Sequence, residues 1–206
     1  MKNKIKILIC DDSKLIRLRL SRFLKSLDMN GAEISIFEAA DGLEGVDLYK
    51  HQIEGVSKLQ YLYKKSKING MLLCDDMGLG KTIQILTFLA WIKEKYELKT
   101  TLIILPTSLI ENWIDEMKKF FIEETFSYEI MQGKETKEKI SKYNNIDIVL
   151  TTYESLRINH ITTGFIKWKV IICDEAQKIK NPKTLITTAI KSQNSEFKIA
   201  CSATPI

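Results

Sequence analysis

The chain has 206 residues, of which 45% are hydrophobic and 28% are charged, and its formal net charge is +5. This length suits one α/β domain, or one domain with a fragment of another. No apolar run approaches the roughly 20 residues that span a bilayer, and residues 5–10 are too short for a signal-peptide core, so we expect a cytoplasmic protein without a membrane partner. Lysine makes up most of the 31 basic residues and is scattered, so charge alone does not assign a nucleic-acid partner.

The four cysteines each end a short apolar run; they are Cys10, Cys74, Cys173 and Cys201. A small hydrophobic side chain packs well at such a place in a buried strand. No pair has the spacing of a metal-binding motif, and the chain has 2 histidines, so a zinc site is not expected.

Residues 1–47 predict a βαβα fragment of strands and amphipathic helices. The expected elements, in chain order, are a strand over 4–10, a helix over 14–27, a strand over 33–39 and a short helix after Gly42. Asp11 and Asp12 directly follow the first strand.

This opening resembles the first half of a response-regulator receiver domain, which has a flavodoxin-like fold. The resemblance rests on the acidic pair Asp11 and Asp12 and on the string EAADGLEGVDL after the second strand. It implies that the pair helps to hold Mg²⁺ beside a phosphorylatable aspartate, but no aspartate lies between Leu48 and Cys74. We therefore expect half a receiver that does not accept phosphate. A plain strand-end turn is the alternative for the acidic pair.

A predicted amphipathic helix over 48–62 leads to the central stretch of the chain, in which an apolar strand over 71–74 runs into a glycine loop and a second amphipathic helix. Glycines let backbone N–H groups close around phosphate oxygens, and the helix N-terminus adds a partial positive charge. A lysine neutralises the outer phosphates and a threonine hydroxyl coordinates Mg²⁺. The pattern predicts a nucleotide site at Asp76, Met77, Gly78, Leu79, Gly80, Lys81 and Thr82. An ordinary glycine-rich turn is the alternative, because Asp75 stands where the general pattern has glycine.

Beyond this loop, continuous apolar strands alternate with helices, which predicts a parallel sheet covered by helices on both faces. Strands are expected over 100–106, 126–131, 146–153, 168–175 and 197–203, and helices over 108–121 (capped by Ser108), over 135–142 and after Pro182.

The strand over 168–175 ends in Asp174 and Glu175. The carboxyl ends of parallel strands meet at one sheet edge, where ligands of open α/β sheets bind. Asp174 is therefore expected to hold the Mg²⁺ that bridges two phosphates, and Glu175 to orient and deprotonate the attacking water. A strand-end acidic pair without a metal is the alternative.

Residues 48–206 together resemble the first ATPase lobe of Swi/Snf-type proteins, which are DNA-translocating members of helicase superfamily two. Six strings carry the resemblance in the family's order: HQIEG (51–55), DDMGLGKT (75–82), ILPTSLIENW (104–113), TTYESLR (151–157), DEAQKIKNP (174–182) and SATPI (202–206). The resemblance implies a RecA-like lobe, ATP and Mg²⁺ as cofactors, and double-stranded DNA as a partner. It also explains Asp75, which belongs to this family's own form of the phosphate loop.

The same resemblance implies roles for single residues. Gln52 reads adenine, and Gln177 stands in the acidic box where many relatives carry histidine. Ser202 and Thr204 couple hydrolysis to movement of the lobe. The residues expected to touch the DNA backbone, without sequence preference, are Thr107, Ser108, Thr151, Thr152 and Tyr153.

Motors of this family bind ATP between two lobes, and the second lobe supplies an arginine that is typically worth about 10³–10⁵ in rate. The printed chain ends at Ile206, where the last motif of the first lobe ends. We therefore expect an incomplete motor that binds ATP and Mg²⁺, hydrolyses ATP weakly and binds DNA weakly. The alternative function is a signalling or interaction module, in which residues 1–47 dock a partner and the lobe is a scaffold. A small-molecule P-loop kinase fits less well, because it has no use for the acidic box or for SATPI.

Overall fold

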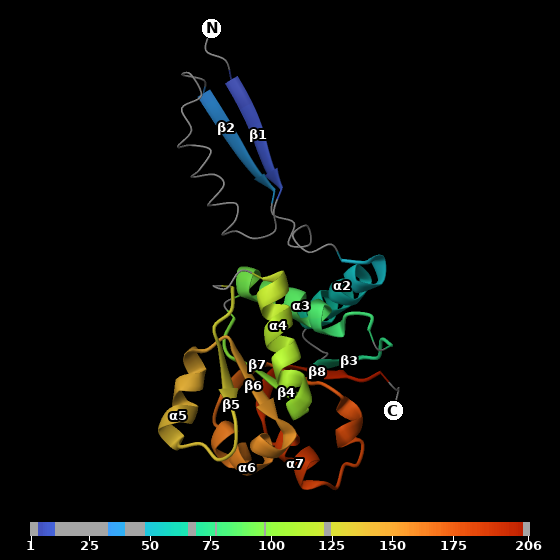
Figure 1. Ribbon diagram of the computed structural model, residues 1–206, viewed down its shortest axis with the longest axis vertical. Helices are drawn as coiled ribbons and strands as arrows, with labels where there is room; N and C mark the ends of the chain where they lie inside the picture. The colour runs from blue at the N-terminus through green and yellow to red at the C-terminus, as the bar shows by residue number, and fades with distance from the viewer. Residues whose placement is uncertain are drawn as a thin grey trace. The chain divides into compact units, whose positions relative to one another are not determined.

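Figure 1 presents the computed structural model of the chain, which describes residues 4–10, 33–39, 48–65, 69–76, 78–96, 98–121 and 125–203. The chain divides into two compact units, residues 1–53 and 54–206, and each is described by itself. The division falls within helix α2, Lys50–Lys64. The domain boundary after residue 47 stays a prediction.

In the first unit, β1 (Lys4–Cys10) and β2 (Glu33–Ala39) pair in parallel, with Lys4 opposite Glu33. Both predicted strands are confirmed. Neighbouring parallel strands need a crossover connection, as a βαβ unit provides. The predicted helix between them and the acidic pair, Asp11 and Asp12, lie outside the described residues, so the receiver resemblance stays a prediction.

The second unit is built on six parallel strands in the order β3-β8-β7-β4-β6-β5. They are β3 (Gly70–Leu73), β4 (Thr101–Leu105), β5 (Tyr128–Met131), β6 (Ile148–Thr152), β7 (Lys167–Cys173) and β8 (Asn194–Cys201). The interior strands β4 and β6 are buried at every residue, and their apolar runs LIIL and IVL are those expected of strands covered on both faces. The predicted α/β class with a parallel sheet is confirmed.

Helices cover both faces of this sheet (Figure 1). One face carries α3 (Lys81–Lys95), α4 (Ile110–Phe120) and the second half of α2, and the other carries α5 (Lys137–Lys142), α6 (Tyr153–Thr163) and α7 (Leu185–Lys191). Within the described residues, three 3₁₀ turns join elements: η1 (Thr107–Leu109), η2 (Tyr143–Asn145) and η3 (Ala176–Ile179). None of the described helices is both long and apolar enough to cross a bilayer.

The core consists of two apolar clusters, one on each face of the sheet. Along β4, Ile103 belongs to the cluster under α3 and α4, whereas Leu102 and Ile104 belong to the cluster under α5, α6 and α7. This alternation follows from the two-residue period of a strand. The first cluster includes Trp113 and the second includes Trp168, so the sheet separates two well-filled layers.

The structure differs from the sequence prediction at two places. The predicted alternation of strands and helices gives no bounds for a helix between β6 and β7, where α6 begins at Tyr153, and Thr152 caps α6 by accepting a hydrogen bond from Ser155 N at 3.1 Å. The β-branched and asparagine residues of α6 have weak helix propensity, and burial of its inner face outweighs that weakness. Ser108 does not cap α4, because it lies inside η1, and neither η1 nor α4 has a side-chain cap.

Gly55 of α2 lies directly against Gln84 of α3. A Cβ atom at Gly55 would lie 1.9 Å from Gln84 Oε1. The Gln84 side chain is fully buried, and its Nε2 donates to Asp75 Oδ2 at 2.8 Å. An added methyl group therefore forces the Gln84 amide to turn, which breaks its hydrogen bond to Asp75.

We expect Gly55→Ala to lower the free energy of unfolding by about 1–2 kcal/mol, because the lost hydrogen bond outweighs the gain of alanine over glycine in a helix. Thermal unfolding followed by circular dichroism measures the change. Ser57→Ala, at an exposed position of the same helix, is the control. Equal melting temperatures for the two variants would contradict the close packing of α2 on Gln84.

Candidate active site

The carboxyl ends of three neighbouring strands carry the candidate site. The phosphate loop follows β3, Ser202 follows β8 and Asp174 follows β7, and β8 lies between the other two. The strand register places the ends of β3, β8 and β7 beside one another, because Ser202 N donates to Leu73 O at 3.1 Å and Cys173 lies opposite Ala200. The structure thus brings the predicted phosphate loop and the predicted acidic pair to one edge of the sheet.

The phosphate loop uses its glycines for their backbone angles. Gly78 and Gly80 have φ values of 81° and 79°, in the left-handed region that favours glycine. Lys81 closes over the loop, since its Nζ donates to Asp75 O at 2.6 Å and to Asp76 O at 3.0 Å. No described side chain caps the start of α3, and the first amides of a helix lack intrahelical partners, so this end suits an anion.

Asp75 has a structural role that the sequence does not reveal. Its carboxylate accepts a hydrogen bond from Gln84 Nε2 at 2.8 Å, which ties the start of the loop to the third position after Lys81 on α3. The signal for this pairing is a polar residue, Gln84, within an otherwise apolar helix face. Leu79 and Thr82 lie at the loop and at the first turn of α3, and the remaining predicted loop residue, Met77, lies outside the described residues.

Asp174 is a buried carboxylate with two hydrogen-bond donors. Its side chain is 9% exposed, its Oδ2 accepts from Trp113 Nε1 at 2.9 Å and its Oδ1 accepts from Glu175 N at 3.0 Å. Burial raises the pKa of the Asp174 carboxyl, and the hydrogen bond from Trp113 and the charge of Lys81 oppose this rise. The charge of Lys81 therefore acts on Asp174, and a cation bound at this carboxylate would offset the free-energy cost of burying its negative charge.

Glu175, Gln177 and Ser202 form a connected set. Glu175 has φ of 52° and is the one non-glycine residue with positive φ among those described, a conformation that is kept only where the surroundings impose it. Gln177 Nε2 donates to Glu175 Oε2 at 2.5 Å, and Ser202 Oγ donates to Gln177 Oε1 at 3.0 Å. One amide therefore links the acidic box after β7 to the segment after β8. Thr204, the other predicted coupling residue, lies outside the described residues.

The two segments expected to touch DNA differ in exposure. Thr107 and Ser108 are exposed on η1, at the same edge of the sheet. The side chains of the second segment are buried: Thr151 Oγ1 donates to Met131 O at 2.9 Å, Thr152 caps α6, and Tyr153 Oη donates to Asp174 O at 2.5 Å. The contact of Thr151, Thr152 and Tyr153 with the DNA backbone stays a prediction, and their buried side chains are engaged within the lobe.

Gln52 lies in the first turn of α2 and is buried, and its Oε1 accepts from Tyr49 N at 2.9 Å. It belongs to the unit of residues 1–53. Its reading of adenine stays a prediction.

Oxygen donors for Mg²⁺ are present at the edge in the form of the Asp174 carboxylate and the Thr82 hydroxyl. No cluster of three or more His, Cys, Asp or Glu that could hold a metal occurs among the described residues. Mg²⁺ commonly binds through one or two protein ligands together with substrate phosphates. The donor set therefore fits Mg²⁺ that arrives with a nucleotide.

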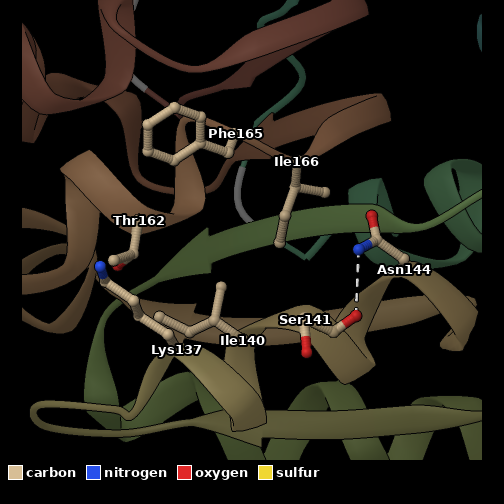
Figure 2. Close-up of a pocket in the computed structure, with 7 residues that line it drawn as sticks. All are labelled: Lys137, Ile140, Ser141, Asn144, Thr162, Phe165 and Ile166. Atoms are coloured by element: carbon tan, nitrogen blue, oxygen red, sulfur yellow. Dashed lines mark hydrogen bonds between the residues drawn. The ribbon is translucent and has the colours of Figure 1, made fainter.

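A separate pocket lies among α5, η2 and the end of α6, as Figure 2 shows, and none of the predicted site residues lines it. Its volume is about 280 Å³. Ile140 and Ile166 form its apolar part, and Phe165, which is 85% exposed, stands beside it. Since η2 precedes β6 and Ile166 precedes β7, this pocket lies toward the amino ends of the strands and is distinct from the candidate site.

The family model described as "SNF2-related domain" matches residues 51–206. Zorya protein ZorD of Escherichia coli O139:H28 is 39% identical over 187 residues, which is 79% of this chain and 17% of that protein. The DNA excision repair protein ERCC-6-like of Danio rerio is 33% identical over 168 residues, which is 77% of this chain and 11% of that protein.

Solved structures agree with this assignment. The Sulfolobus solfataricus SWI2/SNF2 ATPase core in complex with dsDNA is 37% identical with a TM-score of 0.70, over 78% of this chain and 33% of that chain. A second structure, the Sulfolobus solfataricus SWI2/SNF2 ATPase core domain, is 35% identical with a TM-score of 0.66, over 79% of this chain and 34% of that chain. The chain thus spans about a third of the solved cores and less than a fifth of the two curated relatives.

Proposed function

Because the chain belongs to the SNF2-related domain family over residues 51–206, we propose that it is an ATP-binding lobe that hydrolyses ATP weakly and works on double-stranded DNA. The observation that carries the proposal is the sheet edge that unites the phosphate loop with Asp174. Ligands of open α/β sheets bind at this edge.

Different residues of the site are proposed to bind the phosphates, hold Mg²⁺ and activate the water. Lys81 and the first amides of α3 neutralise the phosphates. Thr82 and Asp174 hold Mg²⁺, which supplies charge neutralisation at the phosphates when bound. Glu175, held by the amide of Gln177, orients the attacking water and accepts its proton. The Gln177 amide also accepts a hydrogen bond from Ser202, which follows β8. The position of Glu175 therefore depends on the position of the segment after β8.

Double-stranded DNA is proposed as the partner because the similar Sulfolobus solfataricus core is described in complex with it. On this chain the exposed Thr107 and Ser108 are the candidate contacts. Contacts to DNA phosphates position a protein without reading sequence. We therefore expect weak binding that falls with rising salt and shows no sequence preference.

Replacing Lys81 by alanine tests the site. We expect Lys81→Ala to weaken binding of a fluorescent ATP analogue by about tenfold to a hundredfold, because a charged hydrogen-bond donor to phosphate contributes about 1.5–3 kcal/mol. Fluorescence titration in the presence of Mg²⁺ measures the dissociation constant.

Lys95→Ala is the matched control, since Lys95 is exposed in the last turn of the same helix. Circular dichroism of both variants excludes unfolding as the cause. If Lys81→Ala binds the analogue as tightly as Lys95→Ala, the nucleotide is not held by this loop and the proposed function fails.

A docking role for residues 1–47 is the second candidate, and the parallel pairing of β1 with β2 favours it because that pairing suits a receiver-like βαβ unit. Labelling with acetyl phosphate separates the alternatives. Labelling that Asp11→Asn or Asp12→Asn abolishes would favour a signalling module, and absence of labelling is the result expected of half a receiver.

A further inference from the structure

Asp174 receives a hydrogen bond from α4, a distant part of the chain. Trp113 lies on α4, and its Nε1 donates to Asp174 Oδ2 at 2.9 Å across 61 positions of sequence. An indole N–H can only donate, so this contact requires that the carboxylate turn one oxygen toward α4. The other oxygen, Oδ1, accepts from Glu175 N. The orientation of the carboxylate is thereby fixed by two donors.

The main chain of Asp174 is held from the opposite face of the sheet. Tyr153 begins α6, and its Oη donates to Asp174 O at 2.5 Å in a buried environment. A backbone carbonyl oxygen can only accept and a phenol O–H can donate, so Tyr153 is the donor in this contact. Trp113 belongs to the apolar cluster under α4 and Tyr153 to the cluster under α6, so Asp174 is held from both layers.

We propose that Trp113 and Tyr153 are positioning residues that orient Asp174 for Mg²⁺, an inference that rests on the proposed function. Trp113 fixes the carboxylate and Tyr153 fixes the backbone that carries it. Mutation of a group that holds a metal ligand in place typically costs about 10–100-fold in metal affinity or activity. Trp113 and Tyr153 lie in the strings ILPTSLIENW and TTYESLR, so each of the two strings expected at the DNA backbone sends one hydrogen bond to the metal-binding aspartate.

The rival explanation is that both aromatic rings only fill the core. The chain offers matched controls for it, Trp168 and Tyr143, which are 0% and 1% exposed compared with 2% for Trp113 and 5% for Tyr153. Within the described part of the chain, Trp168 Nε1 and Tyr143 Oη have no hydrogen-bond partner. Replacement by phenylalanine thus removes a buried N–H or O–H in all four cases, but a hydrogen bond to Asp174 in only two.

The experiment compares Trp113→Phe with Trp168→Phe, and Tyr153→Phe with Tyr143→Phe. A fluorescent ATP analogue is bound at increasing Mg²⁺ concentrations, and again in EDTA. We expect Trp113→Phe to raise the Mg²⁺ concentration at half-saturation about tenfold, and Tyr153→Phe to raise it by a smaller factor because it holds the backbone rather than the ligand. Affinity in EDTA should stay unchanged, since a positioning role acts through the metal. If Trp113→Phe and Tyr153→Phe reach half-saturation at the same Mg²⁺ concentrations as Trp168→Phe and Tyr143→Phe, the inference is overturned.

A second measurement uses the wild-type chain and needs no substitution. In wild-type chain saturated with the analogue, Mg²⁺ should shift the indole N–H resonance of Trp113 in a ¹H–¹⁵N spectrum and leave that of Trp168 in place. An unmoved Trp113 resonance would overturn the inference even if Trp113→Phe failed to fold. A wild-type chain whose nucleotide binding ignores Mg²⁺ would overturn the proposed function itself, so the two failures are distinguishable.

Discussion

Glu175→Gln is expected to lower the rate of ATP hydrolysis by about 10²–10⁴-fold, the usual contribution of a positioned general base. The carboxylate of Glu175 is the expected proton acceptor, and an amide cannot take that role. Glutamine keeps the shape of the side chain, and its carbonyl oxygen can still accept the hydrogen bond that Gln177 Nε2 donates to Glu175. The phosphate loop is untouched, so nucleotide affinity should stay within a few-fold of wild type.

Phosphate release at saturating ATP and Mg²⁺ measures this effect, alongside a fluorescence titration for affinity. Glu138→Gln is the control, because Glu138 is an exposed glutamate on α5 that no part of the mechanism uses. A Glu175→Gln chain that hydrolyses ATP as fast as Glu138→Gln would show that another group activates the water. A parallel loss of affinity would instead mean that the variant disturbs the loop.

The sequence predicts the parts of this fold that local patterns determine. Predicted strands with continuous apolar runs, LIIL in β4 and IVL in β6, are confirmed as interior parallel strands, as expected where helices cover both faces of the sheet. The predicted loop with Gly78 and Gly80 between β3 and α3 is confirmed, with Lys81 as the first residue of α3. The meeting of this loop with Asp174 also follows from the sequence, since parallel strands end at a common edge.

The remaining features depend on contacts between distant residues. The bond from Trp113 to Asp174 follows from β4 pairing with β7, which places the segment after β4 beside the acidic box. Burial of Thr151 follows from β5 covering the outer side of β6, where Met131 O accepts its hydroxyl. Helix α6 has weak propensity and forms because Leu156 is buried against the sheet. These three features depend on which strands are neighbours in the sheet. Local sequence patterns do not determine the order of the strands, so the sequence alone does not predict these features.

The 206-residue chain should hydrolyse ATP slowly and gain little from duplex DNA. An arginine that stabilises transition-state charge is worth about 10³–10⁵ in rate in enzymes of this chemistry. Arg157 is the sole arginine of residues 48–206, and its guanidinium is paired with the exposed Glu154 on α6, with Nε donating at 2.9 Å. Lys81 and Mg²⁺ alone leave much of the developing charge unstabilised.

Steady-state phosphate release, with and without duplex DNA and at several protein concentrations, decides the matter. We expect turnover far below about 1 s⁻¹, the low end of typical enzyme rates, and no further loss in Arg157→Ala, because a residue tied to Glu154 contributes nothing to the transition state. Fast turnover that Arg157→Ala abolishes would mean that Arg157 leaves Glu154 and reaches the phosphates. Fast turnover that rises more than proportionally with protein concentration and survives Arg157→Ala would mean that a second copy of the chain supplies the stabilising arginine. Arg17, Arg19 and Arg22 of residues 1–47 would then be the first candidates for that arginine.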